Sequence, residues 1–236
     1  MINGRLKRQI ALLTAAALML VSSVAVGETK ITVTGTGEIQ INADTALISL
    51  GVNARDKDVL KAQQKVNKVI AAIRKAVTAQ GVKKADMNTD FINIYAIYDY
   101  QNDQEKLSAY NVSSALAIKV TDMDSVGAVI DAAFSAGANT LNGISFSASD
   151  TQEAKNKAMT AAVKDAKKRA EVLASAAGLK ITGIESISED GTGSRGNSGT
   201  VAAKGMDTVG TNDSGTVVQA GKIVVSATVS MTFTAE

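Results

Sequence analysis

Four residue types are missing from this chain: cysteine, histidine, tryptophan and proline do not occur among its 236 residues. The lack of cysteine excludes disulfides and thiol chemistry, and the lack of histidine removes the side chain that most often binds transition metals or transfers protons near neutral pH. We therefore expect a protein that is not an enzyme and that holds no metal or cofactor. Without disulfides, its stability must come from its core.

The first 27 residues have the three parts of an export signal. Basic residues precede an apolar run over residues 10–21, and small residues at 25–27 suit a signal peptidase. We expect cleavage after Gly27 and delivery of residues 28–236 to the periplasm of a Gram-negative bacterium, to its outer membrane or to the medium. The alternative is an uncleaved inner-membrane anchor, which is disfavoured because a spanning helix needs about 20 apolar residues.

Charge is nearly balanced once this segment is removed. The whole chain has 25 basic and 23 acidic side chains, and three of the basic ones lie before residue 28. The remainder is close to neutral and has only four Phe and four Tyr. It lacks the basic, aromatic surface of a nucleic-acid-binding protein, so we expect no nucleic-acid partner.

Strand and helix patterns alternate along residues 28–236. The first two expected strands are interpreted as a pair, and the third and fourth as a hairpin around the turn at residues 101–103. Small residues on the last helix predict that it lies close to a sheet, and Ser149 to Glu153 predict overlapping capping boxes at its start. The expected strands are 31–34, 46–52, 91–100, 110–120, 141–147, 181–188 and 222–234, and the expected helices are 56–80, 124–136 and one ending at 177. The stripe expected to be buried on the last helix is Met159, Val163, Ala166, Ala170, Leu173 and Ala177.

The order of these elements predicts an α+β fold made of two β-α-β-β-like halves, 28–121 and 122–236, joined by the short helix. Mixed or antiparallel sheets would be packed by the two long helices. Gly81-Val82-Lys83 and Gly178-Leu179-Lys180 follow the long helices at equivalent places. An internal duplication explains this arrangement, and chance recurrence of a common pattern is the alternative.

A polar segment over residues 191–215 contains seven glycines. Its composition predicts a flexible loop within the second half. Residues 191–196 resemble a dinucleotide-binding fingerprint in glycine spacing alone. Because the pattern predicts no helix after them, we expect no nucleotide site there.

Two carboxylate pairs and one basic cluster are candidates for chemistry. Asp122 with Asp124 and Glu189 with Asp190 suit acid–base work or a hard cation, but one pair lies where a helix starts and the other borders the polar segment. Four basic residues of the last helix suit phosphate or lipid head groups: Lys164, Lys167, Lys168 and Arg169. Since Asp165 and Glu171 interrupt this cluster, we interpret it as a solvated face.

All four tyrosines fall within the expected hairpin: Tyr95, Tyr98, Tyr100 and Tyr110. Tyrosine is favoured at protein interfaces because it combines a large apolar area with a hydroxyl that can stay hydrated. The hairpin is therefore a candidate oligomer interface. The alternative is that the rings stack across the two strands.

Seven short motifs, in order, resemble those of the SIMPL family, also called domain of unknown function 541. They are Val33–Gly37, Asp44–Ala46, Tyr98–Tyr100, Tyr110–Ser113, Asp131–Asn139, Ile144–Phe146 and Gly221–Ala227. The chain departs from the family pattern at Ala43, where members usually have proline, and at Ala109, where they usually have glycine. The resemblance implies a periplasmic or secreted α+β protein without established catalytic residues. At least one member assembles into a large oligomer, and one is linked to oxidative-stress tolerance.

Three function classes follow from these observations. The first is a non-enzymatic periplasmic protein whose homo-oligomer supports envelope integrity or oxidative-stress tolerance, with association at an envelope or membrane surface. The second is a binding or chaperone-like module for a peptide, glycan or small ligand. The third is a hydrolase that uses carboxylates or Ser and Lys alone, which no motif supports.

Overall fold

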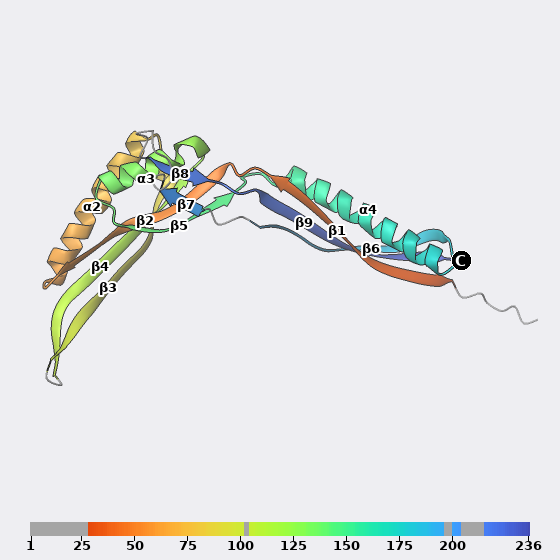
Figure 1. Cartoon of the computed structure of the whole chain (residues 1–236), viewed down its shortest axis with the longest axis horizontal. Helices are drawn as coiled ribbons and strands as arrows, with labels where there is room; N and C mark the ends of the chain where they lie inside the picture. The colour runs from red at the N-terminus through yellow and green to blue at the C-terminus, as the bar shows by residue number, and fades with distance from the viewer. Residues whose placement is uncertain (1–27, 102–103, 196–199, 204–214) are drawn as a thin grey trace, which may run out of the picture.

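The computed structural model describes residues 28–101, 104–195, 200–203 and 215–236. The expected signal peptide at residues 1–27 lies outside them. The described chain has an α+β fold with two main antiparallel sheets, which confirms the expected class. Figure 1 shows the two sheets end to end in a long, bent molecule, each packed by one of the two long helices.

The first sheet, called sheet 1 below, has the strand order β3-β4-β2-β5. Its strands are β2 (Thr45–Asp56), β3 (Met87–Gln101), β4 (Gln104–Val120) and β5 (Thr140–Ser147). Helix α2 (Val59–Ala79) packs on β2 and β4, and α3 (Val126–Ser135) packs beside α2. Short 3-10 turns, η1 (Lys84–Asp86) and η2 (Met123–Ser125), precede β3 and α3. A large apolar core fills the space between the helices and this sheet.

The second sheet, called sheet 2, has the order β1-β9-β6. It consists of β1 (Thr29–Ile41), β6 (Ile181–Arg195) and β9 (Ile223–Ala235), and α4 (Gln152–Ala176) covers one face. Strands β7 (Thr200–Ala203) and β8 (Thr216–Gln219) form a separate two-stranded ribbon. The opposite face of sheet 2 carries mainly Thr and Ser side chains on β1 and β9.

The expected pairing of the first two strands is wrong. Strand β1 pairs with β9, from Thr29 opposite Ala235 to Ile41 opposite Ile223, whereas β2 pairs with β4 and β5. The short connection at residues 42–44 carries the chain from one sheet to the other. A division at residue 121 therefore does not separate the sheets, because β1 lies with the C-terminal strands and β5 with the N-terminal ones.

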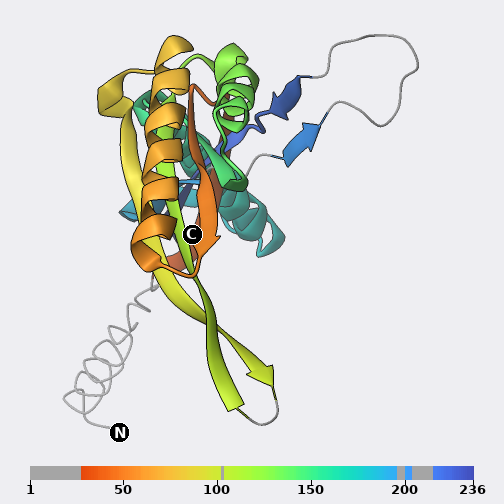
Figure 2. The same ribbon diagram turned by 90° about the vertical axis from the view of Figure 1, so that its left-hand side faces the viewer.

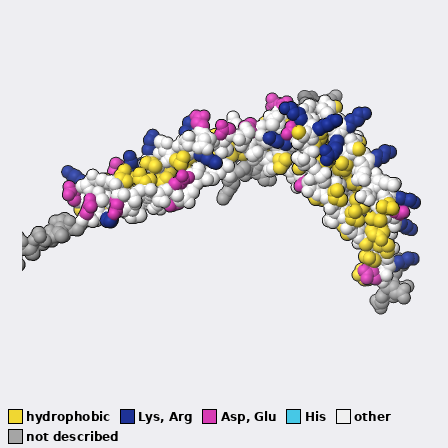
Figure 3. All heavy atoms as spheres, turned by 180° about the vertical axis from the view of Figure 1, so that it is seen from behind, with side chains coloured by type: hydrophobic (Ala, Val, Ile, Leu, Met, Phe, Trp, Pro, Cys, Tyr) yellow, Lys and Arg dark blue, Asp and Glu magenta, His cyan; other side chains and the backbone are white. Residues whose placement is uncertain are grey.

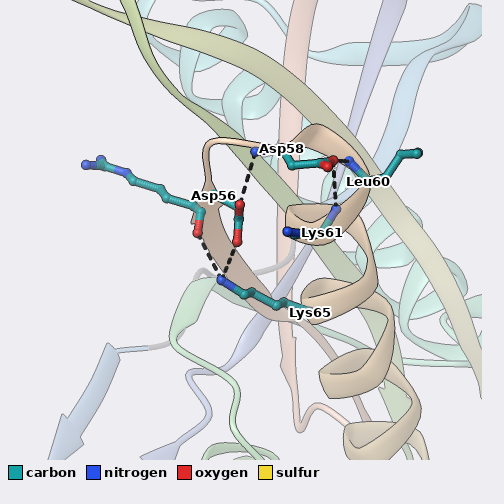
Figure 4. Close-up of polar contacts among 6 residues, drawn as sticks. Asp56, Asp58, Leu60, Lys61 and Lys65 are labelled. Carbon is teal, nitrogen blue, oxygen red and sulfur yellow. Dashed lines mark hydrogen bonds and ion pairs between the residues drawn. The ribbon is translucent and has the colours of Figure 1, made fainter.

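Helix α2 follows its expected pattern. The Asp58 carboxylate accepts hydrogen bonds from the backbone N–H groups of Leu60, at 2.8 Å, and Lys61, at 3.3 Å, and so caps the first turn (Figure 4). The helix ends before Gly81, whose φ of 91° suits glycine. Its buried side chains recur at intervals of four or seven residues, as one helical face requires: Ala62, Val66, Ile73 and Val77.

The start of α4 differs from the expected capping boxes. The backbone N–H and the hydroxyl of Ser149 both donate to the carboxylate of Asp44, and Thr151, the residue before the helix, makes no side-chain cap. The Asp150 carboxylate does accept from the backbone N–H of Gln152 at 2.8 Å, one residue before the expected partner Glu153. The predicted box of Ser149 with Gln152 is wrong, because it considered only local partners. Ser149 binds Asp44, which lies in the connection between β1 and β2, and does not bind the first turn of the helix.

The buried stripe of α4 consists of six alanines: Ala154, Ala158, Ala162, Ala166, Ala170 and Ala174. Ala166 and Ala170 were expected to be buried, but Leu173 is 50% exposed and Ala177 is exposed as well. The close approach to a sheet is confirmed. A Cβ placed on Gly35 of β1 would lie 2.2 Å from the carbonyl oxygen of Ala162, so the helix backbone almost touches the strand.

The prediction of one flexible loop over residues 191–215 is wrong for two parts of it. Residues 191–195 continue β6 and pair with β9, and residues 200–203 form β7, which pairs with β8. The strand continues through glycines because the ladder with β9 uses backbone groups, which every residue supplies. The resemblance to a nucleotide fingerprint thus falls mostly within an antiparallel strand. Residues 196–199 and 204–214 lie outside the described part.

Candidate interaction surface

The β3–β4 hairpin extends beyond the rest of sheet 1. Strand β4 pairs with β2 only from Tyr110 to Val120, whereas its pairing with β3 continues to Gln101 opposite Gln104. Residues 97–101 and 104–109 therefore form a two-stranded projection, called the arm below (Figure 2). The expected hairpin is confirmed, although Asn102 and Asp103 of its expected turn lie outside the described residues.

Three of the four tyrosines are well exposed on this hairpin. The exposed fractions are 49% for Tyr95, 48% for Tyr98 and 76% for Tyr100, whereas Tyr110 is half-buried. Their cross-strand neighbours are Asn111, Leu107, Glu105 and Ala96, respectively. No tyrosine stands directly opposite another across the ladder. The Tyr100 hydroxyl donates to a carboxylate oxygen of Glu105 at 3.2 Å.

Apolar side chains accompany these rings on both faces of the hairpin. Ile94 stands opposite Val112, which packs under α2, so Ile94 lies on the helix-covered side of sheet 1 but remains 44% exposed. Tyr95, the next residue, points to the other side. The other exposed apolar side chains here are Phe91, Ile92 and Leu107. Figure 3 shows hydrophobic side chains along this half of the molecule towards the end of the hairpin.

Strand β3 is also an edge strand, so its outer backbone groups have no neighbouring strand in the described sheet. An exposed edge with apolar side chains is a template for pairing with another chain. Large exposed apolar patches on soluble proteins mark interaction sites. The hairpin therefore has the chemistry of a protein interface.

The candidate carboxylate pairs have structural partners. The Asp122 side chain accepts from the backbone N–H of Asp124 at the start of η2. In β6, the Glu189 carboxylate accepts from the hydroxyl of Thr192. Within the described ranges, no group of three or more acidic side chains is arranged to hold a metal ion.

The basic cluster of α4 is solvated, as interpreted from the sequence. Lys164, Lys167 and Lys168 are exposed, and the Arg169 guanidinium forms an ion pair with Asp165 at 2.9 Å. A shallow groove of about 510 Å³ lies beside it, along the edge of β1. Its lining residues are Val33, Thr34, Asp165, Lys168, Arg169, Val172 and Leu173. The groove was not predicted from the sequence, because Leu173 was expected in the buried stripe of this helix.

Asp44, one of the motif residues, holds the junction between the sheets. Its carboxylate accepts from the Ser149 hydroxyl at 2.6 Å and from the Ser149 backbone N–H at 2.8 Å, and its own N–H donates to the carbonyl of Ser147. The Ser149 hydroxyl, followed by its backbone N–H, lowers the pKa of Asp44 because both bonds favour the charged carboxylate. Asp44 thereby ties the β1–β2 connection to the β5–α4 connection.

Two further motif residues also have structural roles. The Asp131 carboxylate of α3 accepts from the backbone N–H and the hydroxyl of Thr216, which attaches β8 to the helix. The Asn139 amide exchanges two hydrogen bonds with the backbone of Asn53 in β2, at 2.8 and 2.9 Å. These contacts, together with the close approach of α4 to Gly35, show that several motif residues serve to hold elements of the fold together.

In the part of the chain that the structure describes, none of the helices combines the length and the apolar character needed to cross a bilayer.

Comparison with known proteins finds two groups of relatives. The chain is 29% identical over 165 residues to the 26 kDa periplasmic immunogenic protein of Brucella melitensis biotype 1, covering 68% of this chain and 66% of that protein. It is 24% identical over 157 residues to the uncharacterized protein YggE of Escherichia coli K12, covering 66% and 64%. The matches thus span slightly less than two thirds of each relative. The family model of the SIMPL proteins, described as proteins of unknown function (DUF541), matches residues 31–233, and the chain therefore belongs to the SIMPL family.

Proposed function

We propose that this SIMPL protein is a non-enzymatic periplasmic protein that assembles into a homo-oligomer through its β3–β4 hairpin and supports the envelope or its tolerance of oxidative stress. The observation that carries the proposal is the projecting hairpin with exposed apolar side chains on both faces. Seven large apolar side chains of this hairpin are at least 39% exposed: Phe91, Ile92, Ile94, Tyr95, Tyr98, Tyr100 and Leu107.

Burial of these side chains is large enough to offset the cost of such an assembly. Removing the exposed part of one large apolar side chain from water contributes about 1 kcal/mol. Two hairpins that bury these side chains against each other would gain on the order of 10 kcal/mol. The loss of translational and rotational freedom on association costs a free energy of the same magnitude. Backbone pairing at the β3 edge would add to it.

The periplasmic location draws on two observations. The Brucella relative is named a periplasmic protein, and residues 1–27 have the pattern of an export signal. A role in oxidative stress would have to act through structure or partners, because the chain has no thiol to oxidise. The relatives are named as immunogenic or uncharacterized proteins, and neither name describes an enzyme.

Light scattering of the exported chain tests the assembly. We expect the wild type to form a discrete oligomer and Tyr98→Ala with Tyr100→Ala to shift it to smaller species, because two exposed rings leave the arm. Val172→Ala with Leu173→Ala, two exposed apolar residues on α4, is the matched control and should keep the wild-type mass. A wild type that is monomeric, or an unchanged mass in the tyrosine variant, would rule out assembly through the arm.

The second candidate function is a binding module. The groove along β1 favours it, because Val33, Val172 and Leu173 offer an apolar lining with Lys168 and Arg169 at its rim. This alternative gains support if the protein is a monomer and the Val172→Ala, Leu173→Ala variant loses affinity for an anionic amphiphile such as a fatty acid.

A further inference from the structure

Positive charge is concentrated on one helix of this nearly neutral protein. Residues 57–84, which include α2, carry eight basic side chains and one acidic side chain, Asp58, whose carboxylate caps the helix. The rest of the chain has 17 basic and 22 acidic residues, a net charge of −5. The basic residues are Lys57, Lys61, Lys65, Lys68, Arg74, Lys75, Lys83 and Lys84.

Three of these lysines form a row along the outermost side of α2. Lys61, Lys68 and Lys75 are seven residues apart, which is nearly two helical turns or about 10.5 Å. All three are exposed, and they lie opposite the stripe that α2 buries on sheet 1. In Figure 3, Lys and Arg side chains stand along the outer edge of the half that contains sheet 1 and α2.

Few acidic groups neutralise this face. Lys65 forms an ion pair with Asp56 at 2.7 Å at the start of the helix (Figure 4). Among the residues that the structure places, no carboxylate lies within 4.0 Å of the ammonium groups of Lys61, Lys68 or Lys75. Arg74 lies to one side, where its guanidinium donates to the carbonyl of Met87.

Helix α4 shows that this pattern is specific to α2. Its basic residues alternate with Glu153, Asp165 and Glu171, and two of them form ion pairs along the helix. Lys157 binds Glu153 at 2.6 Å, and Arg169 binds Asp165 at 2.9 Å. The solvent face of α4 therefore has mixed charge, whereas that of α2 has one sign.

We propose that the solvent face of α2 docks the protein onto an anionic phospholipid surface. A cluster of four to eight basic residues on an amphipathic helix is attracted to anionic head groups. A straight row of lysines, each a compact point charge, suits a plane of diffuse negative charge. Leu60, which is 63% exposed beside the row, can enter the head-group region.

Nucleic acid fits this face less well. Arginine forks and aromatic rings for base stacking are typical of nucleic-acid sites, and the row itself contains neither. The docking proposal does not depend on oligomer formation, because the arm extends away from the helix (Figure 2). A failure of one proposal therefore leaves the other intact.

Vesicle co-sedimentation of the exported chain tests the docking. We expect binding to vesicles that contain phosphatidylglycerol, weaker binding as salt is added, and little binding to pure phosphatidylcholine. The triple variant Lys61→Gln, Lys68→Gln, Lys75→Gln should lower the partition coefficient roughly 100-fold. Circular dichroism should show that it keeps the wild-type helix content.

The matched control removes three lysines from the other long helix. Lys155→Gln, Lys164→Gln, Lys167→Gln changes the net charge equally, leaves the groove along β1 intact and should retain nearly all binding. Equal losses in the two triple variants, or equal binding to both vesicle types, would overturn the proposal. Binding to a DNA duplex but not to the vesicles would overturn it in favour of nucleic acid. Displacement from vesicles by millimolar inorganic phosphate at constant ionic strength would overturn it in favour of a discrete phosphate site.

Discussion

At the scale of residues, the Asp44 carboxylate accepts three hydrogen bonds. Ser149 supplies its hydroxyl and its backbone N–H, and the Thr45 hydroxyl donates as well, at 2.9 Å. Hydrogen bonds to a charged group are stronger than those between neutral groups. The charge of Asp44 is therefore part of what joins the β1–β2 connection to the start of α4.

The Asp44→Asn variant should change how stability depends on pH. The folded-state pKa of Asp44 lies below its ordinary value of 3.8, so its contribution is present above that value and is lost as the pH falls through the folded-state pKa. We expect the variant to be less stable than the wild type at pH 7 and to lose less stability as the pH falls below about 4. Urea unfolding at several pH values measures both effects.

The control for this prediction is Asp99→Asn, which removes the same charge from the exposed hairpin. It should keep the pH dependence of the wild type. If Asp44→Asn and Asp99→Asn gave the same pH profile, the contacts with Ser149 would contribute nothing to stability.

At the scale of elements, β1 and α4 are matched by small residues on both sides. Gly35 and Gly37 face the alanine stripe, and a Cβ on Gly37 would lie 2.1 Å from the carbonyl oxygen of Ala158. Alanine buries little area per residue, so close approach is how this layer obtains its dispersion contacts. The motif Val33–Gly37 is thereby explained by helix packing.

A side chain at this contact should separate the two elements. Gly35→Ala places a Cβ against the backbone of α4 and should lower the free energy of unfolding by about 2–3 kcal/mol. Gly143→Ala in β5 is the control, because a Cβ there would have no heavy atom within 4 Å, and it should cost under about 1 kcal/mol. Urea unfolding compares the two, and similar losses would contradict the packing argument.

The elements that depend on local pattern were predictable. Helices α2 and α3 and the hairpin have periodicities and glycine ends that do not need a distant partner, since Gly81 and Gly137 adopt φ of 91° and 103°. The start of α4 was not predictable in this way, because Ser149 forms its hydrogen bonds with Asp44, which lies 105 positions earlier. The continuation of β6 through residues 191–195 depended likewise on a distant strand.

At the scale of the whole molecule, the chain has two main cores, which meet at Ile41. Sheet 1 packs large side chains such as Ile48, Leu50 and Phe146 against α2 and α3, whereas sheet 2 packs Met231 and Phe233 against the alanines of α4. Short connections at residues 42–44, 148–151 and 220–222 run between these halves, and a further one, from β6 to β7, lies outside the described residues. Units with their own cores can open independently.

Core substitutions should therefore act on one half at a time. Phe146→Ala should destabilise the sheet 1 half by about 4 kcal/mol and accelerate hydrogen exchange in α2, α3 and β2–β5. Exchange in α4, β1 and β9 should stay close to wild type. Met231→Ala should show the opposite distribution. Accelerated exchange throughout the chain in both variants would show that the two halves unfold as one unit.

The sequence by itself determined the types of the helices and main strands, the glycines that end the helices, the family and the absence of thiol and imidazole chemistry. These follow from composition and from patterns within one element. Only the tertiary structure decided that β1 pairs with β9, that β5 joins β2 and that three tyrosines stand exposed on an arm. Antiparallel ladders use backbone groups common to all residues, and an alternating strand can satisfy its apolar face against several partners. The choice among those partners depends on the packing of the complete chain.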